Sequence, residues 1–159
     1  MRIGTGFDVH AFCAGDYLML GGVKVPFNKA FAAHSDGDVL IHAMCDALLG
    51  ALALGDIGQH FPPNDEKWKD CHSSVFLKHV MGLVINQGYQ VNNIDSTIIC
   101  EQPKMQPHII TMRENLAGMM NLEISQISIK ATTTEKLGYC GRGEGVAVQS
   151  TCLLSKMTS

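Results

Sequence analysis

The sequence predicts an α/β fold of the α+β type, in one domain over residues 1–159. We expect a four-stranded mixed sheet that helices cover on one face, together with a separate short β-hairpin. Two observations predict it. Segments with the apolar patterns of strands and helices alternate along the chain, and the last two are strands. The chain has 159 residues, of which 46% are hydrophobic, and no repeat or linker divides it. This length and composition are typical of one domain with a single hydrophobic core.

The first half of the chain is expected to contain a strand, a hairpin and a helix. Residues 2–9 have the composition of a strand. Residues 17–20 and 23–26 flank a pair of glycines, which is the signal of a two-residue hairpin turn. Over residues 38–54 apolar side chains recur at helical spacing, which predicts the first helix.

The second half is expected to contain two more helices and three more strands. Residues 72–87 are predicted to be a helix that a glycine ends. A third helix is expected from residue 107 to about 120, and its first residue is a proline, which the first turn of a helix tolerates well. Residues 91–100, 127–133 and 145–154 are predicted strands, and the first of these is rich in β-branched residues near its end.

Composition and charge narrow the function classes. The formal net charge is −3 and no run of lysine and arginine occurs, so bulk charge gives no reason to expect nucleic acid or a membrane surface as a partner. The first ten residues lack the apolar core of a signal peptide, and the most apolar stretch, residues 39–54, is too short to span a bilayer. The six cysteines are scattered without a CxxC pair, which favours free thiols in a reducing cytoplasm.

The segment GFDVH, residues 6–10, indicates half of a metal site. Asp8 and His10 lie two residues apart, so on a strand they point to one face and offer an oxygen and an imidazole nitrogen. His42, packed from the first helix, would complete three ligands with an open fourth position, the pattern of a catalytic zinc. Asp46, one turn further on, would orient the His42 ring. The alternative is that His42 belongs to a solvated helix face with Asp38 and Asp46, and that His10 merely ends a strand.

A turn-rich loop after the first helix is a candidate for binding a polar ligand. Residues 55–65 read GDIGQHFPPND, in which Asp56, Gly58 and Asp65 could form hydrogen bonds to hydroxyl groups. An ordinary connection between two helices explains the same residues equally well.

Two other segments suggest anion binding. Residues 101–107 run from a strand end to a helix N-terminus, where backbone N–H groups and the charge of Lys104 favour an anion, although two prolines alone could hold such a loop. Residues 130–138, KATTTEKLG, offer threonine hydroxyls to phosphate oxygens and the Glu135 carboxylate to Mg²⁺ or Mn²⁺. A threonine-rich strand end is also common for structural reasons alone.

Taken together, these segments resemble one family. GFDVH, AHSDGD with the following His42, LGDIG, FPxxD, PKM and KATTTEKLGxxGRGEG occur in the order and at the spacing of the 2-C-methyl-D-erythritol 2,4-cyclodiphosphate synthase family, over essentially the whole chain. The resemblance implies that 4-diphosphocytidyl-2-C-methyl-D-erythritol 2-phosphate is cyclised by attack of its 2-phosphate on the β-phosphorus, with release of CMP, in non-mevalonate isoprenoid synthesis. It also implies a homotrimer whose sheets face the threefold axis, with each active site between two subunits.

The resemblance also implies how the reaction is catalysed. The family's zinc ligands match Asp8, His10 and His42, and Glu135 matches the residue beside a second cation, Mg²⁺ or Mn²⁺, between the α- and β-phosphates. The family's transition-state residues match His34 and Thr133. Because the nucleophile is already a phosphate oxygen, charge neutralisation and positioning matter more than activation of a side chain.

The implied substrate contacts are spread along the chain. Those to the sugar and its phosphates match Asp8, Val9, His10, His34, Ser35, Asp56, Ile57, Gly58, Phe61, Pro62, Pro63, Asn64 and Asp65. Those to the cytidine diphosphate match Cys100, Glu101, Gln102, Pro103, Lys104, Met105, Gln106, Ala131, Thr132, Thr133, Thr134 and Glu135. Arg142, with Tyr139 nearby and Glu144 in the same segment, matches the position on the trimer axis where family members can hold an isoprenoid diphosphate.

The sequence departs from the family's usual pattern in a few places, none of them a proposed metal ligand. Pro63 and Asn64 replace the usual Asp and Thr of the FPDTD loop, which puts one loop contact in doubt. Thr5 stands where histidine is common and Cys100 where alanine is common. Tyr139 replaces the usual phenylalanine and makes the axial cavity slightly more polar.

Two other functions compete with the synthase. A zinc-dependent phosphodiesterase would release CMP and a linear diol monophosphate instead of a cyclic diphosphate. A non-enzymatic trimer that binds an isoprenoid diphosphate through GYCGRGEG would leave Asp8, His10, His42 and KATTTEK unexplained.

Overall fold

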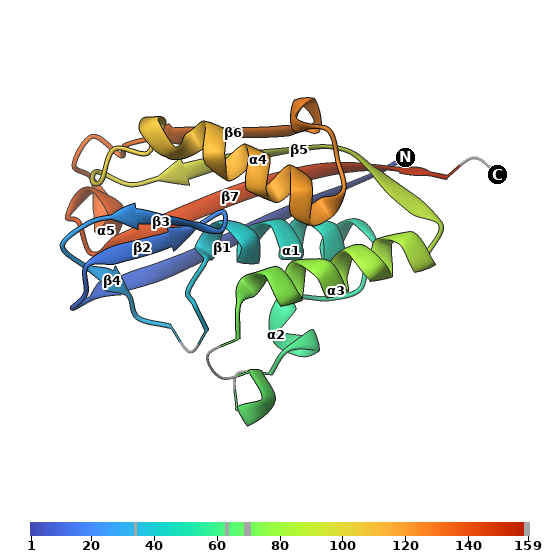
Figure 1. The fold of residues 1–159 in the computed structure, drawn as a ribbon, viewed down its shortest axis with the longest axis horizontal. Helices are drawn as coiled ribbons and strands as arrows, with labels where there is room; N and C mark the ends of the chain where they lie inside the picture. Colours follow the sequence, from blue (N-terminus) through green and yellow to red (C-terminus); the bar gives the residue numbers. More distant parts are fainter. Residues whose placement is uncertain (34, 63, 69–70, 158–159) are drawn as a thin grey trace.

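The computed structural model describes residues 1–33, 35–62, 64–68 and 71–157. Within this part of the chain the main sheet is five-stranded, in the order β4-β1-β7-β5-β6, and a two-stranded hairpin lies beside it (Figure 1). The pair β5–β6 is parallel and the other pairs of the main sheet are antiparallel. The strands are β1 (Arg2–Cys13), β2 (Tyr17–Leu20), β3 (Val23–Pro26), β4 (Ala30–Phe31), β5 (Tyr89–Ile99), β6 (Ile127–Thr132) and β7 (Gly145–Lys156).

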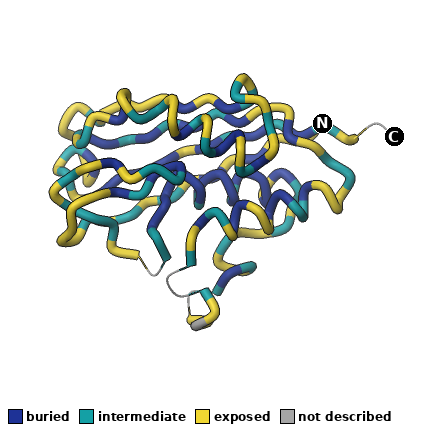
Figure 2. Tube along the Cα trace, viewed as in Figure 1, coloured by how far each residue is buried: buried dark blue, intermediate teal, exposed yellow. Residues whose placement is uncertain are grey.

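Helices α1 (Val39–Ala51), α3 (Ser73–Asn86) and α4 (Ile109–Met120) lie on one face of the main sheet (Figure 1). Helix α1 packs along β1 and β7, and α3 packs beside α1, so the buried residues concentrate between the sheet and the helices (Figure 2). The α-helices are α1 (Val39–Ala51), α2 (Ile57–His60), α3 (Ser73–Asn86), α4 (Ile109–Met120) and α5 (Gly138–Gly141), with 3₁₀ turns at Glu66–Trp68, Gln106–His108 and Ile124–Gln126. Over the ranges described, no helix has the length and apolarity to cross a bilayer.

The mixed sheet, the helices on one of its faces and the hairpin are confirmed, but the predicted number of four strands is wrong. The additional strand is β4, whose two residues pair with the end of β1, Phe12 with Phe31 and Cys13 with Ala30. Two residues are too few to show an alternating pattern in the sequence. The first strand also runs past its predicted end at residue 9 to Cys13, and this extension is the segment that β4 pairs with.

Two glycines let α1 approach the backbone of β1 directly. A Cβ atom on Gly4 would lie 2.0 Å from the Ala47 carbonyl oxygen, and one on Gly6 would lie 2.0 Å from the Ala43 carbonyl oxygen. The contacts move from 47 to 43 on the helix as they move from 4 to 6 on the strand, so the two elements run in opposite directions. The next helical residue toward the helix start, His42, therefore lies beside the strand beyond Gly6.

The face of the sheet that points away from the helices is open and carries both apolar and polar side chains, among them the exposed ion pair of Lys130 with Asp95. Along β1, Gly4, Gly6, Asp8 and His10 alternate with side chains that point the other way. Ile3 is 69% exposed and Phe7 is 55% exposed, although both are large hydrophobic residues. Ile3 and Phe7 therefore lie uncovered on this face of the single chain.

Candidate active site

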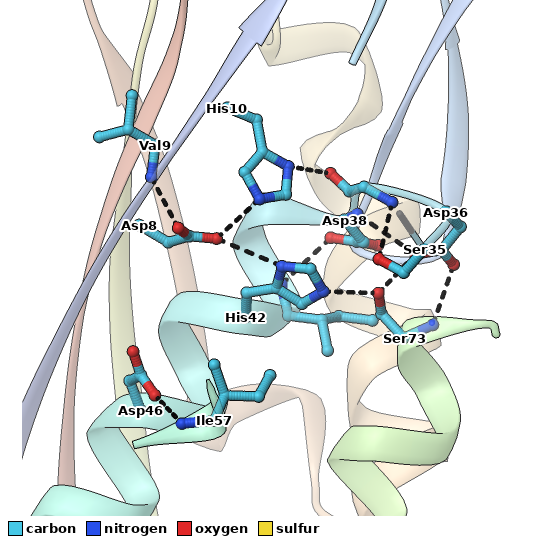
Figure 3. Close-up of polar contacts among 12 residues, drawn as sticks. Asp8, Val9, His10, Ser35, Asp36, Asp38, His42, Asp46, Ile57 and Ser73 are labelled. Carbon is cyan, nitrogen blue, oxygen red and sulfur yellow. Dashed lines mark hydrogen bonds and ion pairs between the residues drawn. The ribbon is translucent and has the colours of Figure 1, made fainter. Parts of the chain in front are cut away.

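The side chains of Asp8, His10 and His42 meet at one point between β1 and α1 (Figure 3). The Asp8 Oδ2 atom lies 3.1 Å from His10 Nε2 and 3.2 Å from His42 Nδ1. One possible ligand atom from each residue lies within 4.8 Å of the other two, so the three can hold a metal ion. The predicted meeting of Asp8 and His10 on the strand with His42 on the helix is confirmed. The three side chains meet because side chains on a helix tilt toward its N-terminus, which here is the direction of Asp8 along β1.

The donor set fits a divalent cation. His10 Nδ1 lies 2.9 Å from the Gly37 carbonyl oxygen, and because a carbonyl only accepts, this nitrogen carries the proton. The other ring nitrogen, Nε2, faces Asp8 and can offer its lone pair to a cation that displaces the proton between them. One carboxylate and two imidazoles are the ligand types that Zn²⁺ and neighbouring transition metals prefer.

The charges of the three groups are strongly coupled. Burial disfavours the Asp8 carboxylate, but the hydrogen bonds and charges of His10 and His42 outweigh it and lower the Asp8 pKa well below its ordinary value. Burial also opposes charge on His10, but the hydrogen bond to Asp8 and its negative charge outweigh that effect and raise the His10 pKa. A cation in this position would replace the proton that the group otherwise shares.

The two aspartates that flank His42 on α1 do not form a solvated stripe with it. Asp38 is 0% exposed and caps α1, with its carboxylate accepting the N–H groups of Ile41, Gly21 and Gly22 at 3.1, 2.9 and 2.8 Å. Burial raises its pKa, against those three hydrogen bonds. The carboxylate thereby joins the hairpin turn to the start of the helix that carries His42.

Asp46 also has a different partner from the one expected. Its carboxylate accepts the Ile57 N–H at 2.7 Å. Within the described ranges the hydrogen-bond partners of the His42 ring are instead Asp8 and Ser73 (Figure 3). Burial, followed in effect by the negative charges of Asp56 and Asp8, raises the pKa of Asp46. Asp46 therefore attaches the start of α2 to α1.

Side-chain contacts hold the described start of the loop that was predicted to contact the sugar and its phosphates. Asp56 caps α2, accepting the Gln59 N–H at 3.0 Å and the Gln59 side-chain amide at 2.9 Å. The Phe61 ring packs on Phe76 and Trp68, with centroid distances of 4.5 and 4.9 Å. His34 and Pro63, which were expected to act in catalysis and in substrate binding, lie outside the described residues.

Glu101 organises the turn after β6, a role that no pattern in the sequence indicated. Its Oε1 atom accepts the N–H groups of Thr134 and Lys136 at 3.1 and 3.2 Å, and the Thr134 hydroxyl lies 3.4 Å away. Glu135 and Lys136 have positive φ angles of 52° and 67°, a conformation that costs residues with side chains about 1 kcal/mol or more each. Glu101 was expected to contact the nucleotide, whereas its observed contacts hold the turn that exposes Glu135.

The segment predicted for the trimer axis forms an ion pair within one chain. Arg142 Nε donates to Glu144 Oε1 at 2.8 Å, and both side chains are exposed. Each group moves the other's pKa, with Arg142 raised and Glu144 lowered. Tyr139, three residues before Arg142, is 41% exposed.

Comparison with known proteins identifies similar chains over nearly the full length. The model of the YgbB family matches residues 1–155. A relative from Xanthomonas oryzae pv. oryzae (strain PXO99A), named 2-C-methyl-D-erythritol 2,4-cyclodiphosphate synthase, is 56% identical over 158 residues, which cover 99% of this chain and 97% of the relative.

Solved structures show the same likeness. The bifunctional IspDF from Campylobacter jejuni has a TM-score of 0.94 and 42% identity, covering 98% of this chain, which spans 42% of that longer protein. A CDP complex of IspF from Plasmodium falciparum has a TM-score of 0.87 and 35% identity, covering 99% of this chain and 97% of the other.

Proposed function

The chain belongs to the YgbB family, and we propose that it catalyses the cyclodiphosphate synthase step of the non-mevalonate route to isoprenoid precursors. It converts 4-diphosphocytidyl-2-C-methyl-D-erythritol 2-phosphate to 2-C-methyl-D-erythritol 2,4-cyclodiphosphate and releases CMP. The observation that carries the proposal is the cluster of Asp8, His10 and His42 in a chain that is 56% identical to a synthase of that name.

The reaction forms one phosphorus–oxygen bond and breaks another. An oxygen of the 2-phosphate attacks the β-phosphorus, and the bond from that phosphorus to the oxygen shared with the α-phosphorus breaks, so CMP leaves with that oxygen. The nucleophile is already an anion, so no serine, cysteine or lysine needs activation. Cys100 fits this scheme, because burial, with smaller effects of Cys140 and Glu101, raises its pKa to about 11 and keeps the thiol neutral.

We assign one Zn²⁺ per chain to Asp8, His10 and His42. Three protein ligands leave a coordination position for a substrate oxygen. The bound cation supplies Lewis acidity and neutralises phosphate charge. The work of the protein here is to keep the two imidazoles in fixed orientations, which the contact of His10 with Gly37 supports.

Glu135 is the residue we assign to a second cation, Mg²⁺ or Mn²⁺. Its side chain is exposed on the turn that Glu101 holds, and a single carboxylate binds Mg²⁺ only when other oxygens, such as those of substrate phosphates, complete the set. This cation is therefore expected to bind together with the substrate rather than before it.

Thr133 and His34 are the groups we assign to stabilise the transition state. The Thr133 Oγ1 atom accepts the Glu135 N–H at 3.2 Å, which leaves the hydroxyl proton available for a phosphoryl oxygen. A donor aimed at developing negative charge is the largest single contribution that a side chain makes in such a reaction.

The remaining contacts are proposed to divide between two parts of the chain. Ser35, residues 56–58 and residues 61–65 would bind the sugar and its phosphates. Residues 100–106 and 131–135 would bind the cytidine diphosphate, mostly through backbone groups. Within the second part Met105 is 2% exposed, while Lys104 beside it is exposed, so the loop is anchored in the core and its lysine is available to a phosphate.

The distance between the two cation sites supports an active site shared between subunits. Strands β7 and β5 separate β1, which carries Asp8, from β6, which leads to Glu135. Three strand spacings span about 14 Å, whereas two cations that act on one diphosphate lie about 4 Å apart. A homotrimer whose open sheet faces surround the axis would bury Ile3 and Phe7 and would bring Glu135 of one subunit to Asp8 of the next.

Arg142 is proposed to bind an isoprenoid diphosphate on that axis. The alternative is that three pairs of Arg142 with Glu144 hold the trimer without a ligand, and the ion pair within one chain is consistent with either state. Farnesyl diphosphate should raise the melting temperature of the wild-type protein but not that of Arg142→Met. A wild type whose melting temperature does not rise contradicts the proposal.

The proposed location is the cytoplasm. All six cysteines are free thiols. Free thiols persist in a reducing compartment, which supports this location.

Phosphorus NMR of the product tests the reaction. With the cytidine-linked substrate, Zn²⁺ and Mg²⁺, we expect CMP and two mutually coupled phosphorus signals from one cyclic diphosphate. CMP with uncoupled monoester signals would instead indicate a phosphodiesterase and would overturn the synthase proposal.

A further inference from the structure

The outer nitrogens of both metal-site imidazoles connect to one short loop, residues 35–38. His10 Nδ1 is 2.9 Å from the carbonyl oxygen of Gly37. Ser73 is the first residue of α3, and its Oγ atom lies 3.0 Å from His42 Nε2. The same Oγ atom contacts the Asp36 carboxylate (Figure 3). One loop thus reaches the two histidines by two different routes, one direct and one through a helix.

The direction of each hydrogen bond in this network follows from its end groups. Asp36 accepts two backbone N–H groups, that of Ser73 at 3.0 Å and that of Asp38 at 3.2 Å, so its carboxylate acts as an acceptor. The Ser73 hydroxyl therefore donates its proton to Asp36 and uses its lone pair to accept the Nε2–H of His42. The remaining ring nitrogens, Nδ1 of His42 and Nε2 of His10, both face Asp8. Each can donate a proton to that carboxylate in the metal-free chain, or offer its lone pair to a bound cation.

The network is shielded from solvent, so water cannot easily replace a missing member. Ser73 is 0% exposed, and the side chains of His42 and Asp36 are 12% and 15% exposed. Removing one partner of a buried hydrogen bond leaves the other unsatisfied, which costs more than the bond itself contributes. Asp36 also holds the first N–H of α3, so it fixes the position of Ser73 as well as the direction of its proton.

We propose that Asp36 and Ser73 are positioning residues that orient His42 for metal binding, with Gly37 of the same loop performing this role for His10. The inference rests on the proposed metal centre but not on the proposed reaction. Ser35, a proposed substrate contact, belongs to the same loop and accepts the Gly37 N–H at 3.2 Å, so the loop joins the metal ligands to the substrate site.

The affinity for Zn²⁺ measures this role without any turnover. Metal-free protein would be titrated with Zn²⁺ against a chromophoric chelator for the wild type, Ser73→Ala and the matched control Ser74→Ala, the next residue on the same helix. Loss of a group that orients a histidine ligand typically weakens metal binding by about 10- to 100-fold. We expect that loss for Ser73→Ala and a dissociation constant within about twofold of the wild type for Ser74→Ala. Equal affinities for the two variants would overturn the proposal.

A spectroscopic comparison separates positioning from a general structural role. In Co²⁺-loaded protein the d–d absorption reports ligand orientation, and Ser73→Ala should change it while Ser74→Ala should not. If Ser73→Ala lowers only the melting temperature of the metal-free protein, with affinity and spectrum unchanged, the role is structural and the proposal is wrong.

The double variant tests whether Asp36 acts through Ser73. Asp36→Asn replaces an acceptor oxygen by a donor and should weaken Zn²⁺ binding by a smaller factor than Ser73→Ala. Combined with Ser73→Ala it should add little, because the hydroxyl that it orients is gone. Factors that multiply would refute the connection through Ser73. A wild type that binds no Zn²⁺ would overturn the metal centre and its support together, whereas the phosphorus NMR product is judged separately.

Discussion

The two regions proposed to bind cations are built in opposite ways. Asp8, His10 and His42 are half-buried side chains on a strand and a helix, and further groups behind them hold the two histidines. Glu135 is exposed on a turn whose shape comes from the backbone, with two residues at positive φ held by Glu101. The first arrangement can bind a metal by itself. The second presents one carboxylate and needs phosphate oxygens to complete a site.

Removing a ligand from the preformed cluster should have the largest effect. His42→Ala leaves one imidazole and one carboxylate, so bound zinc should be lost. Losing a group that only orients a ligand costs up to about a hundredfold, so losing a ligand itself should lower turnover by at least about that factor. Elemental analysis of the purified variant measures the zinc, and His79→Ala, an exposed histidine on α3, is the control. A full complement of zinc in His42→Ala would show that the ligand assignment is wrong.

Glu135→Gln tests the other half of the comparison. The amide keeps the size of the side chain and removes its charge, so the Mg²⁺ or Mn²⁺ concentration for half-maximal turnover should rise about tenfold, the equivalent of roughly 1.4 kcal/mol of binding. Bound zinc should stay unchanged, because Glu135 does not contribute to that cluster. A metal titration that superimposes on that of the wild type would remove Glu135 from the second site.

A smaller effect in the same direction is expected for Glu101→Ala. The variant leaves the Thr134 and Lys136 N–H groups without their acceptor, and water replaces it because the turn is largely exposed. A loss of about 1 kcal/mol would raise the required Mg²⁺ concentration roughly fivefold, with zinc content unaffected. If CMP affinity falls in calorimetry while the Mg²⁺ titration stays the same, Glu101 contacts the nucleotide, as the resemblance implied.

The smallest effects of substitution are expected in residues 100–106, which are proposed to bind the cytidine diphosphate. Lys104→Ala should weaken CDP and CMP binding together by a few-fold, since an exposed lysine paired with phosphate contributes up to about 1 kcal/mol. Cys100→Ala should change either affinity by less than about twofold, because the Cys100 backbone N–H already pairs with the Thr132 carbonyl at 3.0 Å. If calorimetry shows that Cys100→Ala abolishes CMP binding, the proposal that backbone groups recognise the cytosine base is wrong.

The features that could be predicted from the sequence are those that produce a regular spacing of residues. Residues two apart on a strand share a face, so Asp8 and His10 could be paired in advance. Helical spacing placed His42 on a helix face but left its packing against that strand as a hypothesis. Spacing of four residues could not distinguish a helix face from a helix cap, which is why Asp38 was grouped with His42 although it is a buried N-cap. The two-residue strand β4 was missed for want of any period.

The supporting contacts were beyond the reach of sequence patterns. Ser73 lies 31 residues from His42 and Asp36 lies 37 from Ser73, and only the packing of α3 against α1 brings them together. Asp46 was expected to serve His42 because it lies one turn away, yet the Ile57 N–H is its partner. Glu101 gave no signal, since a glutamate after a strand is common and its three partners belong to a turn more than 30 residues later.

The direct contact of α1 with β1 at Gly4 and Gly6 has an evolutionary consequence. Where side chains separate a helix from a sheet, a larger side chain between them forces the backbones to shift apart. At these two positions no side chain separates the elements, and no residue is smaller than glycine, so substitution can only push His42 away from Asp8 and His10. Substitution can therefore change the residue types around His42, Asp8 and His10, but it cannot bring α1 closer to β1 than the two glycines already allow.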